Sequence, residues 1–409
     1  MKKDWEIKKL DEVCTVFEDG DWIESKDQSN GGIRLIQTGN IGNGFFKDRG
    51  EKARYISKET FKRLRCTEIF EGDCLISRLP DPVGRACILP DTGEPMITAV
   101  DCTIIRFNKE RIISDWFLFY SLAEEYQKEI NKQVTGATRQ RISRKNLGFI
   151  KIPIPPLPEQ QHIVSILDEA FAAIAKAKAN AQQNLQNAKE LFESYLQSVF
   201  ENKGEDWEEK ILKEITTILG DGLHGTPKYK TDGDYYFING NNLNNGVIEI
   251  KDNTKRVSVD EYKKYNKNLN DRTVLVSING TLCNIAFFNN EKIILGKSAC
   301  YFNLKEGIDK SYIKYVLSSM YFIKYAHKEA TGATIKNVSL KTMREFKVPL
   351  PNLQEQQTIV QKLDDLSLET KKLESIYKKK IEDFEELKKS ILQKAFAGEL
   401  TTNQIPELA

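Results

Sequence analysis

The chain has 409 residues, of which 40% are hydrophobic and 29% are charged, and its formal net charge is +2. At about 150 residues per domain, this length predicts two or three domains with substantial cores. No apolar run approaches the roughly 20 residues that span a bilayer, and no secretory signal is apparent at the start. We therefore expect a globular cytoplasmic protein without membrane segments.

Short apolar runs bounded by Gly, Pro, Asn and Asp predict strands in the front part of each half of the chain. In the first half they cover 32–36, 73–77, 86–89 and 102–107, and in the second half 235–238, 273–277 and 299–304. Apolar residues spaced three and four apart predict helical stretches near 114–132 and 310–329. Each half therefore begins with a globular part of mixed α and β structure.

A long helix is predicted to follow each globular part. The stretch from Glu159 to Phe200 contains no Pro or Gly, and apolar residues at four-three spacing form one narrow seam along it. A helix of about 40 residues rises about 60 Å and cannot bury such a seam alone. We expect the two helices to pack antiparallel as a coiled coil. The seam positions are Ile163, Leu167, Ala170, Ile174, Ala177 and Ala181, with Ile359, Leu363, Leu366, Thr370, Leu373 and Tyr377 in the second helix, which Gly398 would end.

Two polar residues, Asn184 and Lys380, interrupt these seams at equivalent positions. The seam can shift by one place to Leu185 and Ile381, which would leave both polar side chains exposed. A buried pair that sets the register of the helices is the alternative.

An internal repeat organises the whole sequence. Residues 155–164 recur at 351–360 and residues 135–138 recur at 331–334, in both cases 196 positions later, while the front parts match at an offset of 202. This predicts an α+β protein: two α/β globular domains joined by two long antiparallel coiled-coil helices, with an internal pseudo-twofold repeat. The expected domains are 1–156, a spacer helix at 157–202, a second domain at 203–352, a second spacer helix at 353–400, and a tail at 401–409. A duplication kept only for stability is the alternative.

The repeated segments resemble the DNA-specificity subunit of type I restriction-modification systems over nearly the whole chain. The matching features are the triplet Trp5, Leu10, Val13 and its repeat Trp207, Leu212, Ile215; the elements Asn40-Ile41-x-x-Gly44 and Asn242-Leu243-x-x-Gly246; Thr135-Gly136-Ala137-Thr138; the Pro-Leu-Pro-Glu-Gln-Gln entry at 156–161; and the closing segment 390–400.

This resemblance implies a non-catalytic subunit with two target-recognition domains, each of which binds one half of a bipartite site in double-stranded DNA. The paired helices would set the spacer and dock two methyltransferase subunits, to which restriction subunits are added. The resemblance also implies that no cofactor is held in this chain, and that S-adenosylmethionine, ATP and Mg²⁺ act in the partner subunits.

The motifs of catalysis are missing from the sequence. There is no Asn/Asp-Pro-Pro-aromatic tetrapeptide of an amino-methyltransferase and no nucleotide-binding Gly-x-x-x-x-Gly-Lys-Ser/Thr loop. Seven cysteines never show Cys-x-x-Cys spacing, and three histidines lie far apart, so we expect reduced core thiols and no metal site. A structural adaptor that pairs two protein-binding domains without contacting DNA is the alternative function.

Candidate phosphate contacts cluster after the Thr-Gly-Ala-Thr loops. Four cations within seven residues suit phosphate binding, and glycine lets backbone amides approach an anion closely. A solvated loop is the alternative. The candidates are Gly136, Thr138, Arg139, Arg141, Arg144 and Lys145 in the first copy and Gly332, Thr334 and Lys336 in the second.

Candidate base contacts lie where predicted strands end. Arg78 and Arg85 are placed at such transitions, where side chains are commonly offered to bases. Asn279-Gly280-Thr281 takes the place of Arg78 in the second copy, so the chemistry there should differ. Asparagine can pair with adenine, although Asn-Gly and Asn-Asn pairs are also typical of turns. The candidates in the second copy are Lys228, Lys230, Asn239, Asn242 and Lys297.

Two further positions have structural and functional alternatives. Trp5 and Trp207 are expected to anchor the domain cores rather than to stack on bases. Glutamates at the helix entries suit capping and the helix dipole, and partner docking is the second interpretation. The docking candidates are Glu159, Gln160, Glu355 and Gln356.

Overall fold

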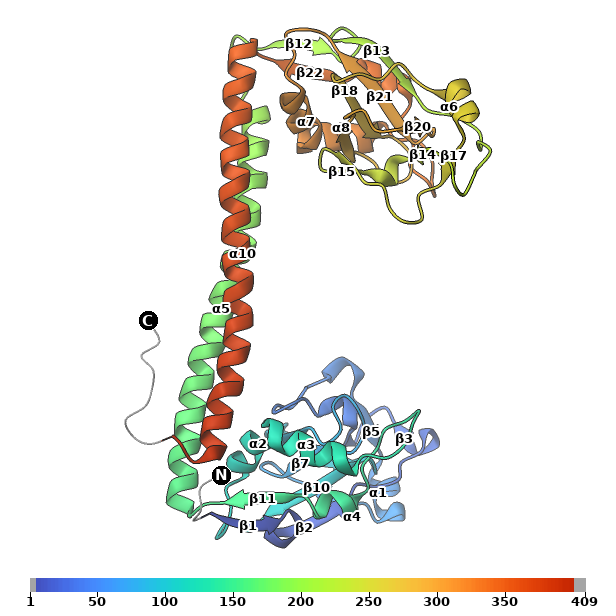
Figure 1. Ribbon diagram of the computed structural model, residues 1–409. Helices are drawn as coiled ribbons and strands as arrows, with labels where there is room; N and C mark the ends of the chain where they lie inside the picture. Colours follow the sequence, from blue (N-terminus) through green and yellow to red (C-terminus); the bar gives the residue numbers. More distant parts are fainter. Residues whose placement is uncertain (1–4, 401–409) are drawn as a thin grey trace. The chain divides into compact units, whose positions relative to one another are not determined.

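The computed structural model describes residues 5–400, which form two compact units (Figure 1). Unit 1 runs to Ala181 and resumes at Lys379, and unit 2 runs from Gln182 to Lys378. Each unit contains one globular part and a portion of each of two long helices. The predicted tail, 401–409, lies outside the described residues. Among residues 5–400, no helix combines the length and apolar character that a membrane crossing requires.

The globular part of unit 1 contains eleven described strands, four short helices and the start of a long helix. The strands are β1 (Glu6–Lys9), β2 (Cys14–Asp19), β3 (Gln28–Ser29), β4 (Ile33–Ile36), β5 (Arg54–Ile56), β6 (Glu68–Ile69), β7 (Cys74–Ser77), β8 (Ala86–Ile88), β9 (Met96–Thr98), β10 (Cys102–Phe107) and β11 (Lys151–Ile154). The helices are α1 (Lys58–Leu64), α2 (Ser114–Ser121), α3 (Glu124–Gln133), α4 (Arg144–Gly148) and the long α5 (Leu157–Glu201), with 3-10 turns η1 (Asp11–Val13), η2 (Ser25–Asp27), η3 (Thr38–Asn40) and η4 (Gly50–Lys52).

Unit 2 has the same kinds of element in a similar order. Its strands are β12 (Glu208–Ile211), β13 (Thr216–Asp221), β14 (Tyr235–Ile238), β15 (Leu243–Asn244), β16 (Val247–Ile248), β17 (Arg256–Val257), β18 (Thr273–Ser277), β19 (Ile285–Phe287), β20 (Ile293–Leu295), β21 (Ala299–Leu304) and β22 (Lys347–Leu350). Its helices are α6 (Val259–Tyr265), α7 (Lys310–Ser318), α8 (Met320–Glu329), α9 (Leu340–Glu345) and the long α10 (Leu353–Ala397), with one 3-10 turn, η5 (Gly240–Asn242).

The two units share their sheet topology. An antiparallel sheet has the order β2-β10-β7-β8 in unit 1 and β13-β21-β18-β19 in unit 2. Each unit has a second sheet that contains one parallel pair of strands, β4 with β9 in unit 1 and β14 with β20 in unit 2. The strand that opens each unit's globular part pairs with the strand before the long helix, β1 with β11 and β12 with β22. The sequence repeat is therefore also a repeat of chain path.

The apolar runs correspond closely to the central strands. Strands β14, β18 and β21 occupy the predicted residues, and each of these runs is buried in whole or in part. The two predicted helical stretches are each divided, into α2 and α3 and into α7 and α8. At both breaks a serine hydroxyl donates to the carbonyl three residues earlier, Ser121 to Leu118 and Ser319 to Val316. Such bonds accompany the end of a helix, where carbonyls lose their backbone donors.

Each unit has its main core between the globular part and the long helices. In unit 1, Trp116 packs edge-on against Trp5 and Phe396, with ring centroids 5.4 and 4.9 Å away. In unit 2, Tyr312 lies 5.9 Å from Phe200 and 6.4 Å from Trp207. The prediction that both opening tryptophans anchor their cores is confirmed.

The long helices bury part of the predicted seams. Ile163, Leu167, Ile174 and Ala181 are buried in α5, and Leu363 and Thr370 are buried in α10. Leu373 is predicted to lie in the seam but is 37% exposed, so this part of the prediction is wrong.

The helix portions in unit 1 run antiparallel. Lys178 pairs with Glu385, and the Lys388 ammonium lies 4.6 Å from the ring centroid of Phe171. Later residues of α5 thus meet earlier residues of α10 (Figure 1).

The polar interruptions of the seams face outward. Asn184 and Lys380 are exposed, while Leu185 and Ile381 are partly buried, which confirms the expected shift of the seam by one place. The helix stop is also confirmed, since Gly398 follows the last residue of α10 with φ +78°.

All seven cysteines are free thiols and five of them are buried. Burial raises the pKa of both the Cys87 and Cys102 thiols to about 12. These thiols are neutral core side chains, as the sequence predicts.

Candidate nucleic-acid interface

The Thr-Gly-Ala-Thr segment of unit 1 forms a closed loop between α3 and α4. The backbone amides of Thr135 and Arg141 each donate to the carbonyl of the other at 2.9 Å. Gly136 has φ +96°, and a Cβ there would lie 2.4 Å from the Arg139 carbonyl oxygen. Only glycine fits this position, and Thr138 is exposed at the loop.

The cations of this loop are exposed and partly oriented by one carboxylate. Arg141 and Arg139 lie 3.2 and 3.6 Å from Asp101, with 46% and 74% of their side chains exposed. Arg144 and Lys145 are exposed on α4, and the Lys145 ammonium lies 5.9 Å from the ring centroid of Phe149. Exposed ion pairs are weak, so these guanidinium groups can exchange Asp101 for a phosphate at little cost.

The backbone of Arg78 fixes the loop to the end of β7. Its carbonyl accepts a hydrogen bond from the backbone amide of Ile142 at 3.2 Å. The side chain of Arg78 is only 2% exposed, and it donates to the Val100 carbonyl at 2.5 Å and lies 3.3 Å from Asp19. The expectation that Arg78 contacts bases does not fit this geometry. Its guanidinium group joins three segments of unit 1 instead.

Arg85 also has a structural position. Its side chain is 7% exposed and donates four hydrogen bonds to backbone carbonyls. The acceptors are Ile41 at 2.7 Å, Leu79 at 2.7 Å, Thr38 at 2.8 Å and Pro82 at 3.0 Å. Because these bonds use the guanidinium group inside the fold, the predicted base contact by Arg85 is also corrected.

Unit 2 repeats the loop with different side chains. Thr331 and Asn337 exchange two backbone hydrogen bonds of 2.9 Å, and Gly332 has φ +95°. The loop meets the end of β18 through the Asn279 amide, which donates to the side-chain oxygen of Asn337 at 3.1 Å. Thr334 and Lys336 are exposed, as expected for contact residues.

Beside this loop lies a hollow of ≈ 460 Å³ that both polar and apolar residues line. Lys297, a sequence candidate, borders it together with Asn279 and Asn337. His224 and Asp221 complete the polar side, with His224 Nε2 2.7 Å from an Asp221 carboxylate oxygen. The hollow therefore presents amide, ammonium, imidazole and carboxylate groups, which are the groups that distinguish base edges.

The corresponding place in unit 1 carries an exposed tryptophan. A backbone bridge joins Asp21 to Ala99 in unit 1 and Leu223 to Gly296 in unit 2, so the next residues, Trp22 and His224, occupy equivalent places. Trp22 is 71% exposed, and its Nε1 donates to Glu24 at 3.4 Å. Neither residue is predicted from the sequence, since nothing local in the sequence relates either of them to the loop.

The asparagines proposed as base contacts in unit 2 form a turn. Asn242 is 7% exposed, accepts from the Asn239 amide at 3.0 Å and donates to the Glu249 carbonyl at 3.0 Å. The side-chain oxygen of Asn239 accepts from Ser298 at 3.1 Å. The predicted base contact by Asn242 is therefore corrected to a structural role, and the hydrogen bond of Asn239 with Ser298 is also internal to unit 2.

Lys228 and Lys230 are exposed but do not border the His224 hollow. Lys230 instead lines a separate hollow of ≈ 510 Å³ together with Lys255 and Arg256. The structure thus divides the sequence candidates of unit 2 between two places.

The glutamines at the helix entries bind their own globular parts. Gln160 is fully buried, accepts from the Ile113 amide at 2.9 Å and donates to the carbonyls of Arg111 and Pro155, both at 2.8 Å. Gln356 is 1% exposed and accepts from the Asp309 amide at 2.8 Å.

Burial corrects the prediction that these glutamines dock a partner. The Glu355 carboxylate accepts from Trp207 at 2.8 Å, and Glu159 is half-buried in the first turn of α5.

The comparisons with known proteins agree with the repeat. The family model for the type I restriction modification DNA specificity domain matches residues 2–185 and again 204–383. The chain belongs to this family. A curated relative, a type I restriction enzyme MjaX specificity subunit described as putative, from Methanocaldococcus jannaschii, is 26% identical and covers 98% of this chain and 94% of its own. The MjaVIII specificity subunit of the same organism is 27% identical over 73% of each chain.

Solved structures share the fold along nearly the whole length. The HsdS subunit from Thermoanaerobacter tengcongensis has a TM-score of 0.64 at 16% identity and covers 98% of both chains. A chain from a study of complex assembly and conformational transition of the type I R-M system has a TM-score of 0.75 at 18% identity, covering 98% of this chain and 99% of its own.

Proposed function

We propose that this chain is the DNA-specificity subunit of a type I restriction-modification complex, in which each unit recognises one half of a bipartite site in double-stranded DNA. The observation that supports this most is the repeated loop framework with unequal side chains. Trp22 and Arg141 in unit 1 stand where unit 2 has His224 and Asn337. A common framework with different polar groups suits two different half-sites.

The cationic loop supplies the sequence-independent part of binding. Arg139 and Arg141 would contact phosphates, and Arg144, Lys145 and Lys336 would add to this contact. Phosphate contacts position a protein on the duplex, and base-edge contacts then give the specificity. We assign base contacts to Trp22 in unit 1 and to the His224 hollow, with Lys297 and Asn279, in unit 2.

The long helices would hold the two recognition domains a fixed distance apart. We propose that α5 and α10 pack antiparallel as a coiled coil about a pseudo-twofold axis, and that two methyltransferase subunits dock on this assembly. The antiparallel contacts of Lys178 and Phe171 in unit 1 support such pairing.

We propose that the chain is non-catalytic and holds no cofactor, while S-adenosylmethionine, ATP and Mg²⁺ act in methyltransferase and restriction subunits. The proposed cytoplasmic location follows from this role. The family membership does not favour the adaptor alternative.

The test is to co-express the chain with its methyltransferase subunit and to map methylated adenines across the genome. A split motif with a fixed gap, lost when this chain is omitted, is the expected result. The variants His224→Ala and Asn279→Ala should relax only the half-site of unit 2, and Trp22→Ala only the other half. An active, assembled methyltransferase that produces no split motif would refute the proposal and favour the adaptor.

A further inference from the structure

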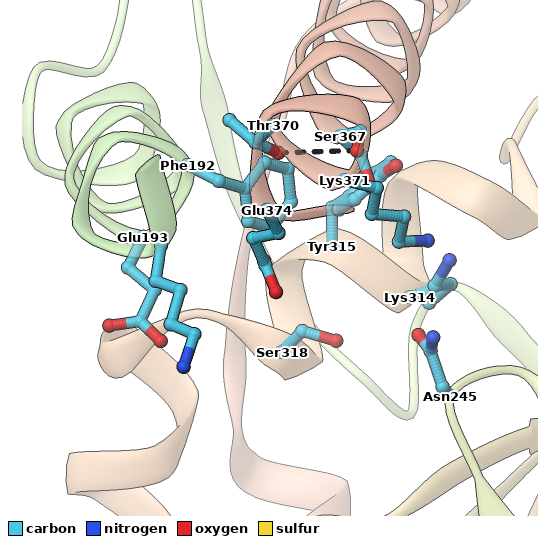
Figure 2. A pocket seen from close by; sticks show the side chains of 11 residues that line it. Phe192, Glu193, Asn245, Lys314, Tyr315, Ser318, Ser367, Thr370, Lys371 and Glu374 are labelled. Atoms are coloured by element: carbon cyan, nitrogen blue, oxygen red, sulfur yellow. Dashed lines mark hydrogen bonds between the residues drawn. The ribbon is translucent and has the colours of Figure 1, made fainter. Parts of the chain in front are cut away.

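Unit 2 contains a further hollow, of ≈ 390 Å³, between α5, α7 and α10 (Figure 2). Three lysines border it, Lys189 from α5, Lys314 from α7 and Lys371 from α10. Two carboxylates, Glu193 and Glu374, also border it, so the ionised lining carries an excess of positive charge. None of these side chains belongs to the loop framework described above.

In unit 1, aromatic and other apolar side chains occupy part of the equivalent place. Phe171 packs edge-on against Phe119 with ring centroids 5.4 Å apart, and the Lys388 ammonium lies over the Phe171 ring. The residue 196 positions after Phe171 is Ser367, which removes the ring and leaves space. Leu118 and Leu122 are likewise replaced by Lys314 and Ser318. Three apolar residues that pack together in unit 1 are thus replaced by polar residues at the hollow of unit 2.

Two lysines of this hollow form no ion pair with a carboxylate in the described part of the chain. Among residues 5–400, neither Lys314 nor Lys371 forms an ion pair, while Glu374 is engaged by Lys378 at 3.4 Å. Lys314 is half-buried, and its ammonium lies 5.0 Å from the ring centroid of Tyr315. Burial is the main cause that lowers the pKa of Lys314, the Asp364 carboxylate raises it in part, and the charge of Lys371 lowers it by a smaller amount. Asp364 therefore compensates the desolvation of Lys314 only in part, and a bound anion would offset the remainder together with the repulsion from Lys371.

We propose that this hollow binds a phosphate group between Lys314 and Lys371. Figure 2 shows the two amino groups on the same side of the hollow, with the Asn245 amide beside Lys314. Ammonium groups and an amide N–H are suitable donors to phosphate oxygens. The phosphate comes either from a free anion such as a nucleotide or from the backbone of duplex DNA. The proposal does not depend on base recognition by the loops.

The first experiment is titration calorimetry of the full chain at low salt, with pyrophosphate as the probe. Lys314→Leu and Lys371→Ala introduce the residues that unit 1 has at these positions, and each should weaken binding about tenfold, the effect of one lost charged hydrogen bond. Ser367→Phe should abolish binding without any change in charge, because its ring fills the hollow as Phe171 does in unit 1. Lys372→Ala, an exposed lysine paired with Glu369, is the matched control and should bind as the unaltered chain does. Circular dichroism verifies that each variant is folded.

The second experiment distinguishes the source of the phosphate with a short duplex that contains no methylation site. If pyrophosphate fails to bind, but Lys314→Leu lowers both the affinity for the duplex and the dependence of that affinity on salt concentration, the phosphate is that of the DNA backbone. If folded variants change neither pyrophosphate nor duplex binding, the proposal is overturned. The variants should retain the split methylation motif, so this outcome is separable from a failure of base recognition.

Discussion

Arg85 provides a sharp test of the difference between a buried structural arginine and a base contact. Replacing it with methionine keeps much of the volume but removes the donors of four hydrogen bonds to the carbonyls of Thr38, Ile41, Leu79 and Pro82. A net loss of about 1 kcal/mol per bond predicts a destabilisation of about 4 kcal/mol. Because methionine is uncharged, the variant avoids the desolvation cost of a buried guanidinium group that has no carboxylate partner. This reduces the expected destabilisation to about 3 kcal/mol. Arg85→Lys keeps one or two of the bonds and should lose about half as much.

The assay is scanning calorimetry of the full chain combined with amide hydrogen exchange. For a unit of this size, about 3 kcal/mol corresponds to a fall in Tm of about 6–12 °C. Exchange should accelerate in the segments that Arg85 joins, 38–41 and 79–85. Arg139→Met, at a side chain that is 74% exposed, is the matched control and should change stability by less than about 0.5 kcal/mol.

The functional result then separates the two interpretations. At a temperature where Arg85→Lys is folded, the methylated motif should be unchanged, because the side chain does not reach the surface. A variant with native stability and an altered half-site would refute the structural role and restore the base contact.

The remaining predictions concern the helix entries, the cationic loop and the thiols. Gln160→Ala should destabilise unit 1 by about 2–4 kcal/mol in urea unfolding, since three buried hydrogen bonds are lost. The control Gln161→Ala, at an exposed neighbouring residue, should leave the stability unchanged, and equal effects of the two variants would contradict the prediction. Replacing Arg139 and Arg141 with Ala should weaken binding to all DNA sequences. The slope of the logarithm of the binding constant against the logarithm of the salt concentration should fall by about 0.9 per lost phosphate contact, and an unchanged slope would argue against these contacts. Cys102 should react slowly with iodoacetamide at pH 8 in the native chain, because burial raises its pKa to about 12, and rapid labelling before unfolding would disprove this.

The difference between the repeats has a simple physical origin. Phe171 and Ser367 occupy equivalent positions in α5 and α10, yet one completes an aromatic cluster and the other borders a hollow. Helix formation tolerates either residue on this face, so the backbone repeat survives while the surface between helices diverges. The same reasoning applies to Trp22 and His224, which follow equivalent backbone bridges.

The sequence by itself determined the repeat, the central strands and the two long helices, because these depend on local apolar spacing and on punctuation by Pro and Gly. It also drew attention to Gly136 and Gly332, whose loop conformation requires glycine. Apart from the repeat, which is read by comparing the two halves, these signals lie within a few residues of one another in the chain.

Tertiary structure alone decided which polar side chains face outward. Arg85 resembles an exposed loop arginine in sequence, but its acceptors include Ile41 and Thr38, more than forty positions earlier. Gln160 resembles a surface residue of a helix entry, yet its acceptor at Arg111 lies 49 positions away. Carbonyls that are distant in sequence and converge only after folding can satisfy a buried guanidinium or amide group, and local sequence patterns do not encode that convergence.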